Sequence, residues 1–361
     1  MSTKKEQVTE IFIIRAIACL AIVLLHSVTS SLSKFSNLDS TSQDILVGLQ
    51  MILIFGTPVF VFISEFLLSK SYPKHLPKGF FIKRFKFLLL PYLSMAVIYG
   101  IIDAGSLSLN ALIIEILRNI ILADYVGYFI IIIFQFYFLH LFFQKYFYRW
   151  KAKYVLPITF IINGAFLAFF NFVPPMEFIP HSEYVWTRLS WMPFVGWIFY
   201  FSLGYYSGKN IQYFKSFIQK YKIYLFIGTF ISIIVVLTSQ FLGLPNLVSS
   251  KRVDILIFTT LLVLSLFYLS SKIKKVPSVI FLISNYSFNI YLLHKIFMTY
   301  LERLPINNIA IYILLLFLIS LGASISLAKI INKLPFGKYI VGNTATFKSP
   351  DKEHKYVRKA V

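Results

Sequence analysis

Long apolar runs constrain this chain more than any other feature of its sequence. A helix needs about 20 apolar residues to cross the hydrocarbon core of a bilayer, and it satisfies its own backbone hydrogen bonds there. With 58% hydrophobic residues, the chain carries more apolar surface than a soluble domain could cover. We therefore predict an all-α, polytopic membrane bundle of about ten transmembrane helices, over residues 11–33, 45–68, 87–104, 126–144, 154–171, 191–208, 223–243, 254–271, 279–301 and 307–328.

The basic residues predict the orientation of this bundle. The net charge is +21, and the Lys and Arg residues form short clusters between the apolar runs. If both termini are cytoplasmic, 27 of the 35 basic residues face the cytoplasm and 6 face outward, as the positive-inside rule expects. We predict a cytoplasmic N-terminus (1–10), a single transmembrane domain (11–328) and a basic cytoplasmic tail (329–361). Charge placed this way fits a lipid bilayer as partner and argues against a nucleic acid.

The sequence has a single cysteine, Cys19, inside the first apolar run. One cysteine excludes an intrachain disulfide and a thiolate-rich metal centre. No metal-ligand motif, phosphate-binding glycine loop or nucleophile elbow is recognisable, so we expect no metal. Cys19 is interpreted as a small packing residue, with a transient acyl thioester as the alternative.

Two ionisable residues interrupt the first run, whose central part reads RAIACLAIVLLH from Arg15 to His26. A spacing of 11 residues puts them on one face of a helix, within about 20° of each other and about 16 Å apart along the axis. Intramembrane ionisable residues are candidates for function because lipid disfavours them. The alternatives are that Arg15 extends to the cytoplasmic headgroups and that His26 bonds to a neighbouring helix.

A basic cluster precedes the third run, in GFFIKRFKFLLLPY. Arg84 and Lys86 in this cluster either anchor the helix or hold the phosphates of a cytoplasmic cofactor, because guanidinium binds phosphate through two hydrogen bonds. Glu65, near the cytoplasmic end of the second run, is expected to pair with one of these cations or with Arg15, or to reach water.

Further polar residues follow in the fourth and ninth runs. Tyr128 and Gln135 are seven residues apart and therefore share a helix face. Tyr291 and His294 belong to ISNYSFNIYLLHKIF, where most polar side chains are expected to hold helices together. The segment 172–190, rich in proline and aromatic residues, is a candidate cover for an external cleft.

The order of these motifs resembles the acyltransferase 3 family of integral membrane O-acyltransferases over nearly the whole chain. The resemblance is carried by Arg15 and His26 in the first run, the basic cluster before Pro91, and IYLLH ending in His294. FGTPVFVFISEFLL and GWIFYFSLGYYSG are similar to the intercellular adhesion protein C branch, which is implicated in O-succinylation of poly-N-acetylglucosamine.

The resemblance implies transfer of an acyl group, acetyl or succinyl, from cytoplasmic acyl-CoA to hydroxyls of an extracellular or cell-envelope polysaccharide. It further implies a bacterial cytoplasmic membrane location and, as a candidate partner, a polysaccharide synthase complex. His26 would act as general base or acyl carrier, and Arg15 would hold the thioester or stabilise the oxyanion. Arg84 and Lys86 would bind the CoA phosphates. Glu65, Tyr128, Gln135, Tyr291 and His294 are predicted to contact substrate or support the site.

Two other functions remain open from the sequence. A transporter that exports a polysaccharide or a small acyl metabolite would also need polar residues inside the membrane, although no inverted repeat is visible. A purely structural partner of a synthase would explain the cytoplasmic charge but not the alignment of Arg15 with His26.

Overall fold

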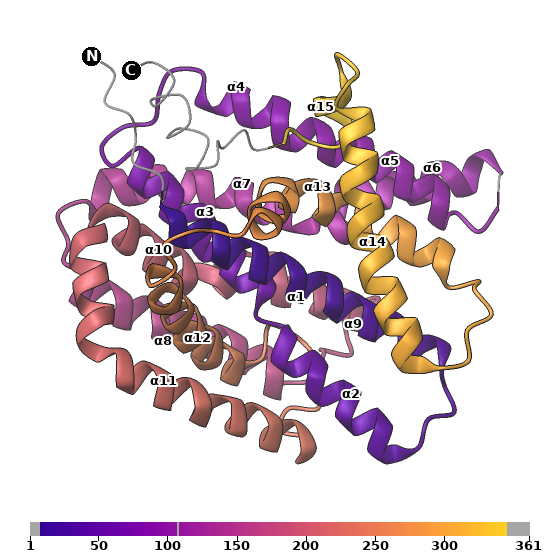
Figure 1. Ribbon diagram of the computed structural model, residues 1–361, viewed down its shortest axis with the longest axis horizontal. Helices are drawn as coiled ribbons and strands as arrows, with labels where there is room; N and C mark the ends of the chain where they lie inside the picture. The colour runs from indigo at the N-terminus through magenta and orange to yellow at the C-terminus, as the bar shows by residue number, and fades with distance from the viewer. Residues whose placement is uncertain (1–7, 107, 345–361) are drawn as a thin grey trace.

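Helices make up the architecture of the described chain. The computed structural model describes residues 8–106 and 108–344 and contains no β-strand among them. Most of the predicted segment 1–10 and the end of the predicted tail 329–361 lie outside these residues. The helices are shown in Figure 1 and are α1 (Thr9–Lys34), α2 (Ser40–Leu53), α3 (Gly56–Ser71), α4 (Phe80–Arg84), α5 (Leu90–Asp103), α6 (Leu109–Ile121), α7 (Phe129–Phe142), α8 (Ala152–Phe172), α9 (Ser182–Trp191), α10 (Ile198–Lys209), α11 (Ile211–Phe241), α12 (Val253–Ser271), α13 (Ser278–Leu301), α14 (Ile309–Ile331) and α15 (Gly337–Ile340).

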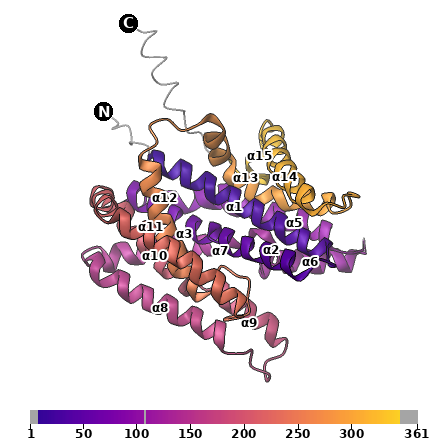
Figure 2. The same ribbon diagram turned by 60° about the horizontal axis from the view of Figure 1, so that its bottom comes forward.

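Helix α1 is the central element of the bundle. It contacts α2, α3, α12, α13 and α14, so helices from both halves of the chain pack around it. Figure 1 shows α1 crossing the middle of the bundle, and Figure 2 shows α13 and α14 above it and α3 and α10 below it. Ile14, Ala16 and Ala18 are fully buried in this helix. The first apolar run therefore lies inside the protein, where its polar residues face protein groups instead of lipid.

Each of the ten predicted ranges contains helix, and eight segments are long and apolar enough to cross a membrane. Two helices of the predicted set do not meet that criterion. Helix α10 has only 12 residues, and α13 has 24 residues but buries polar side chains such as Ser284, Asn289 and His294. Both pack in the interior, α10 against α3 and α13 between α1 and α14. The all-helical membrane fold is confirmed, while the number of crossings and the side of the termini stay predictions.

The close pairing of α3 with α10 depends on glycine. A Cβ atom at Gly208 would lie 2.2 Å from the carbonyl oxygen of Phe66, and one at Gly204 would lie 2.6 Å from that of Phe62. The two glycines are four residues apart and form the small-residue stripe that lets membrane helices approach closely. The Ser69 hydroxyl adds a hydrogen bond of 2.7 Å to the carbonyl of Tyr205. This contact fixes α3 in the position from which it presents Glu65.

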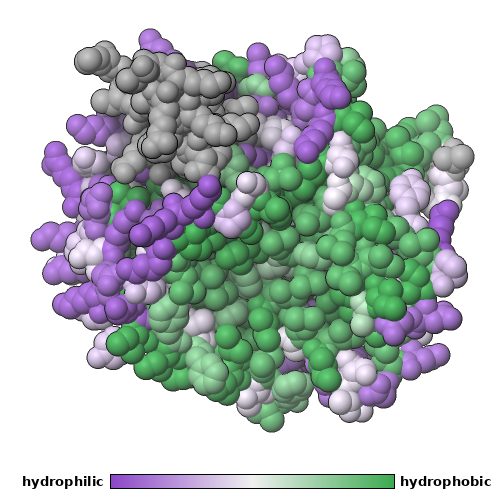
Figure 3. Space-filling view, in the orientation of Figure 1, coloured by the Kyte–Doolittle hydropathy of each residue, from purple (hydrophilic) through white to green (hydrophobic). Residues whose placement is uncertain are grey.

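The surface has the pattern of a membrane protein. Hydrophobic residues cover the centre of the face shown in Figure 3, and hydrophilic residues gather toward its left and right margins. Large apolar side chains are exposed on the outer helices, among them Ile161 (67%), Phe230 (66%) and Leu314 (55%). Exposed apolar area of this extent is stable only against lipid. The protein is a polytopic membrane protein.

Candidate active site

A cavity of about 350 Å³ lies beside His26. The segments at its wall are far apart in sequence: α1, α3, the residues before α7, α9, the residue before Arg252, and α13. Most of them belong to the end of the bundle that the distribution of basic residues predicts to be external. The lining residues are Ile22, His26, Thr57, Ala123, Asp124, Tyr125, Val126, Tyr128, Arg188, Trp191, Lys251, Tyr291 and Lys295.

His26 and His294 form a pair at this cavity. Their ring centroids are 5.2 Å apart, with the planes inclined at 38°. The Nδ1 of His294 lies 2.8 Å from the carbonyl oxygen of Ile290 and donates to it, which leaves Nε2 as the acceptor nitrogen. His294 is fully buried, whereas His26 is partly exposed to the cavity and makes no hydrogen bond to any described residue. His26 is thus the imidazole with free nitrogen valences at the cavity, and His294 packs behind it.

Three other predicted residues hold or line the cavity wall. The Tyr291 hydroxyl donates to the carbonyl of Val126 and accepts the Phe129 amide at 3.2 Å, so it ties α13 to the start of α7. Gln135 donates to the carbonyl of Met192 at 2.9 Å and accepts the Phe194 amide at 3.0 Å. These bonds fix the segment after α9, whose Trp191 packs on the Tyr128 ring at a centroid distance of 4.6 Å.

Three cations that were not predicted as site residues, Arg188, Lys251 and Lys295, line this cavity. Arg188 forms an ion pair with Asp124 and stacks on Trp191. Lys251 is surrounded by three aromatic rings, with its Nζ 5.4 Å from the ring centres of Tyr128 and Trp197 and 6.0 Å from that of Trp191. Lys295 is the third. Arg188 lies on α9 and Lys251 in the loop before α12, and only the tertiary structure brings them near His26. The position of Lys295 next to His294 in an apolar run was a signal.

A buried ion pair holds the segment that carries Lys251. Arg252 is fully buried and binds Asp254 through Nε at 3.0 Å and Nη2 at 2.6 Å. Its Nη2 also donates to the Ser239 hydroxyl at 2.7 Å, and its Nη1 donates to the Gln240 side chain. A charge buried this completely needs all of these partners.

The predicted donor residues lie away from the cavity. Arg15 is partly buried on α1, eleven residues before His26 in the same helix. Arg84 is partly buried over the rings of Phe80 (4.9 Å) and Tyr137 (5.4 Å). Lys86 is exposed on a π-helical turn (Phe85–Leu89). The structure therefore brings His26, Tyr128, Tyr291 and His294 together but keeps Arg15, Arg84 and Lys86 apart from them.

The predicted partner of Glu65 was wrong. Its Oε1 lies 2.6 Å from Nδ1 of His140, and both side chains are almost completely buried. The pairing joins α3 to α7, and within residues 8–106 and 108–344 no ion pair joins Glu65 to Arg84 or Lys86. The error arose because His140 lies 75 positions away and was read as part of an apolar helix. Glu65 supports the packing of the bundle and does not line the cavity beside His26.

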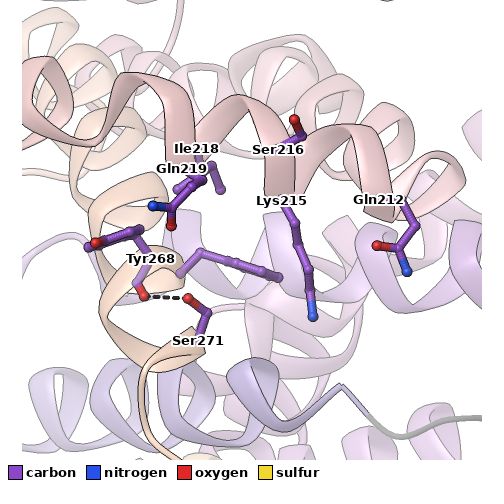
Figure 4. Close-up of a pocket in the computed structure, with 8 residues that line it drawn as sticks. Gln212, Lys215, Ser216, Ile218, Gln219, Tyr268 and Ser271 are labelled. Atoms are coloured by element: carbon purple, nitrogen blue, oxygen red, sulfur yellow. Dashed lines mark hydrogen bonds between the residues drawn. The ribbon is translucent and has the colours of Figure 1, made fainter.

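A second cavity, also of about 350 Å³, lies between α11 and α12 (Figure 4). Its polar lining includes Gln212, Lys215 and Gln219 on α11 and Ser271 on α12. Lys215 already forms an ion pair with Glu10 at 2.6 Å, so the positive charge of this cavity is compensated by α1. It contains none of the predicted site residues.

Known proteins resemble this chain over nearly its whole length. The acyltransferase 3 family model, described as an acyltransferase domain, matches residues 8–329. A relative from Bacillus subtilis (strain 168), named "Putative membrane-bound acyltransferase YfiQ", is 37% identical over 93% of this chain and 94% of its own length.

Further relatives carry the name "Probable poly-beta-1,6-N-acetyl-D-glucosamine export protein". The one from Staphylococcus aureus (strain Mu50) is 27% identical over 92% of this chain and 95% of its own length, and the one from Staphylococcus epidermidis is 27% identical over 94% and 95%. No solved structure matches the chain. The family match covers nearly all of the transmembrane bundle, so this chain belongs to the acyltransferase 3 family and is a membrane acyltransferase.

Proposed function

We propose that the protein moves an acyl group from cytoplasmic acyl-CoA to hydroxyl groups of an extracellular polysaccharide, in the bacterial cytoplasmic membrane. The observation that carries the proposal is the free imidazole of His26 in a cavity lined by aromatic and basic residues. Histidine suits proton transfer at neutral pH because its ordinary pKa is near 6.5. The family membership supports the type of reaction.

The acceptor side of the proposal rests on the composition of the cavity. Tyr125, Tyr128, Trp191 and Tyr291 present aromatic groups, while Lys251 and Arg188 present hydrogen-bond donors. Aromatic faces with a few polar groups suit a sugar ring, which has apolar faces and polar edges. The names of the staphylococcal relatives favour an exopolysaccharide such as poly-N-acetylglucosamine as the acceptor, with a synthase complex as a candidate partner.

The proposed donor site lies at the opposite end of the bundle from the cavity. Arg84 and Lys86 are proposed to bind the phosphates of CoA, and Arg15 to hold the thioester at an intermediate depth. Arg84 keeps its guanidinium within reach of water while its face stacks on Phe80 and Tyr137, which preorganises it for a phosphate. Acetyl-CoA and succinyl-CoA share the same CoA moiety, so both acyl groups are candidates for transfer.

His26 can act in two ways in this reaction. As a general base it would take the proton of the acceptor hydroxyl while that oxygen attacks the thioester carbonyl. As a nucleophile it would first accept the acyl group and then pass it to the hydroxyl. His294 would orient the ring in either case, because it is packed against His26 and is itself held by the carbonyl of Ile290.

Export of a glycan is the second candidate, favoured by the names of the staphylococcal relatives. Mass spectrometry of the extracellular polysaccharide, with and without the gene, separates the two. An acyltransferase predicts that cells without the protein secrete the same amount of polymer without its esters. If the polymer itself disappears from the medium and accumulates inside the cell, the transport function is supported and ours is rejected.

A further inference from the structure

We propose that Lys295 is a catalytic residue whose ammonium group stabilises the negative charge that develops on the acyl carbonyl oxygen beside His26. The inference rests on the proposed acyl transfer and assigns to Lys295 on α13 the oxyanion role that the family resemblance implied for Arg15. Four observations support it: the place of Lys295 in the cavity, its position relative to His26, the absence of an acidic partner among the described residues, and the distance of Arg15.

Lys295 and His26 line the same cavity from two different helices. The Nζ of Lys295 lies 3.4 Å from the hydroxyl of Ser30. Ser30 is four residues after His26 on α1, so it lies about one helical turn, roughly 6 Å, further along the same face. The neighbouring residue, His294, packs its ring 5.2 Å from that of His26. Contacts from two successive residues of α13 therefore fix the ammonium close to the imidazole.

The positive charge of Lys295 is less compensated by neighbouring groups than the charges of the other two cations of the cavity. Arg188 has Asp124, and Lys251 has three aromatic rings. Within residues 8–106 and 108–344, no carboxylate lies within ion-pair distance of Lys295, and the Ser30 hydroxyl is its hydrogen-bond partner. Asp103, exposed at the end of α5, interacts with it only at longer range. A lysine placed this way in a membrane bundle marks a site where a negative charge is expected from a ligand.

Arg15 cannot serve the same atom. It precedes His26 by eleven residues in one continuous α-helix, which is about 16 Å along the axis. A hydrogen bond to an oxyanion requires a donor about 2.7–3.1 Å from the oxygen. One acyl carbonyl can reach His26 and Lys295 together, because both line one cavity, but not His26 and Arg15. Arg15 is therefore assigned to the donor side, where it would hold the thioester before the acyl group reaches the cavity.

The chemical step balances without a further reagent. His26 accepts the proton of the acceptor hydroxyl as the hydroxyl oxygen forms a bond to the thioester carbon. The π electrons of the carbonyl move to its oxygen, and this oxyanion pairs with the Lys295 ammonium. When the carbonyl re-forms, the carbon–sulfur bond breaks, and the CoA thiolate leaves with the proton from His26. The products are the glycan ester and free CoA, and Lys295 remains protonated throughout.

The test uses the full-length protein reconstituted in lipid vesicles, with acetyl-CoA or succinyl-CoA and a poly-N-acetylglucosamine oligosaccharide. Loss of one oxyanion donor typically lowers kcat by about 100- to 1,000-fold. We expect Lys295→Met to lower kcat by this factor and to leave KM for acyl-CoA within about threefold, while Lys251→Met acts mainly on KM for the acceptor. Lys220→Met, at an exposed position on α11, is the unaffected control.

Chemical rescue separates loss of the charge from loss of the fold. Lys295→Cys in a Cys19→Ser background carries one cysteine, and aminoethylation of that cysteine restores an ammonium of nearly the same length. Recovery of kcat after aminoethylation supports the proposal. A kcat for Lys295→Met within threefold of wild type, or no recovery in folded, modified Lys295→Cys, overturns it. If the wild-type protein itself transfers no acyl group to any offered glycan, the proposed function has failed instead.

Discussion

At the residue scale, the pair of histidines gives a direct prediction. His294→Phe keeps a planar ring against His26 but removes the nitrogen that bonds to the carbonyl of Ile290. A misplacement of about 1 Å at a reacting group can cost up to about 100-fold in rate, so we expect kcat to fall by between 10- and 100-fold with little change in KM. Steady-state kinetics of the reconstituted enzyme measure this. His75→Phe, at an exposed position, is the control, and equal rates for the two variants would refute a positioning role.

The buried pair of Glu65 and His140 predicts a stability effect without a catalytic one. Removing one partner of a buried pair leaves the other uncompensated and costs about 3–5 kcal/mol. Glu65→Ala should therefore unfold in detergent at a much lower temperature, and Glu65→Gln, which keeps a hydrogen-bond acceptor, should lose less. Glu115→Ala breaks the exposed pair with Arg118 and is expected to cost about 0–1 kcal/mol. Thermal unfolding followed by circular dichroism compares them, and equal losses for Glu65→Ala and Glu115→Ala would contradict the assignment.

At the scale of elements, α3 and α10 are held by their glycines. Gly208→Ala would put a methyl group against the backbone of Phe66, and backbone cannot move as a side-chain tip can. Overpacking of this kind costs about 1–3 kcal/mol. Gly322→Ala on α14 has open space around it and should stabilise its helix by up to about 1 kcal/mol. The melting temperature in detergent should fall for Gly208→Ala and rise for Gly322→Ala. A shift in the same direction for both variants would contradict the role of the close contact between α3 and α10.

The helices also show which features of the fold and the site could be predicted from the sequence. Helix positions followed from the apolar runs because lipid leaves few other ways to satisfy a backbone. The alignment of Arg15 with His26 followed from helical periodicity alone. The partner of Glu65 and the cations around His26 could not be predicted from the sequence, since His140, Arg188 and Lys251 lie in distant segments with no local pattern. Helix α13 was predicted as a span over 279–301, but it buries polar side chains and is not among the eight segments that are long and apolar enough to cross a membrane.

At the scale of the whole molecule, the basic residues predict that His26 opens outward. Single cysteines test this in a Cys19→Ser background, because Cys19 is the chain's sole cysteine. A cysteine at Asn37, exposed after α1, should react with a membrane-impermeant maleimide in intact cells, and one at Lys78 should react only after permeabilisation. The reverse labelling pattern would place the cavity on the cytoplasmic side. The proposed acceptor site and donor site would then have to exchange ends of the bundle.

The measurement that tests the whole account most directly is the ester content of the extracellular glycan made by cells carrying His26→Ala. The variant must be present in the membrane at the wild-type level, which an epitope tag can quantify. Our account predicts undiminished secretion of a glycan without the acyl esters that this protein adds, because His26 is the group at which the transfer takes place. A glycan with wild-type ester content from His26→Ala cells would contradict it.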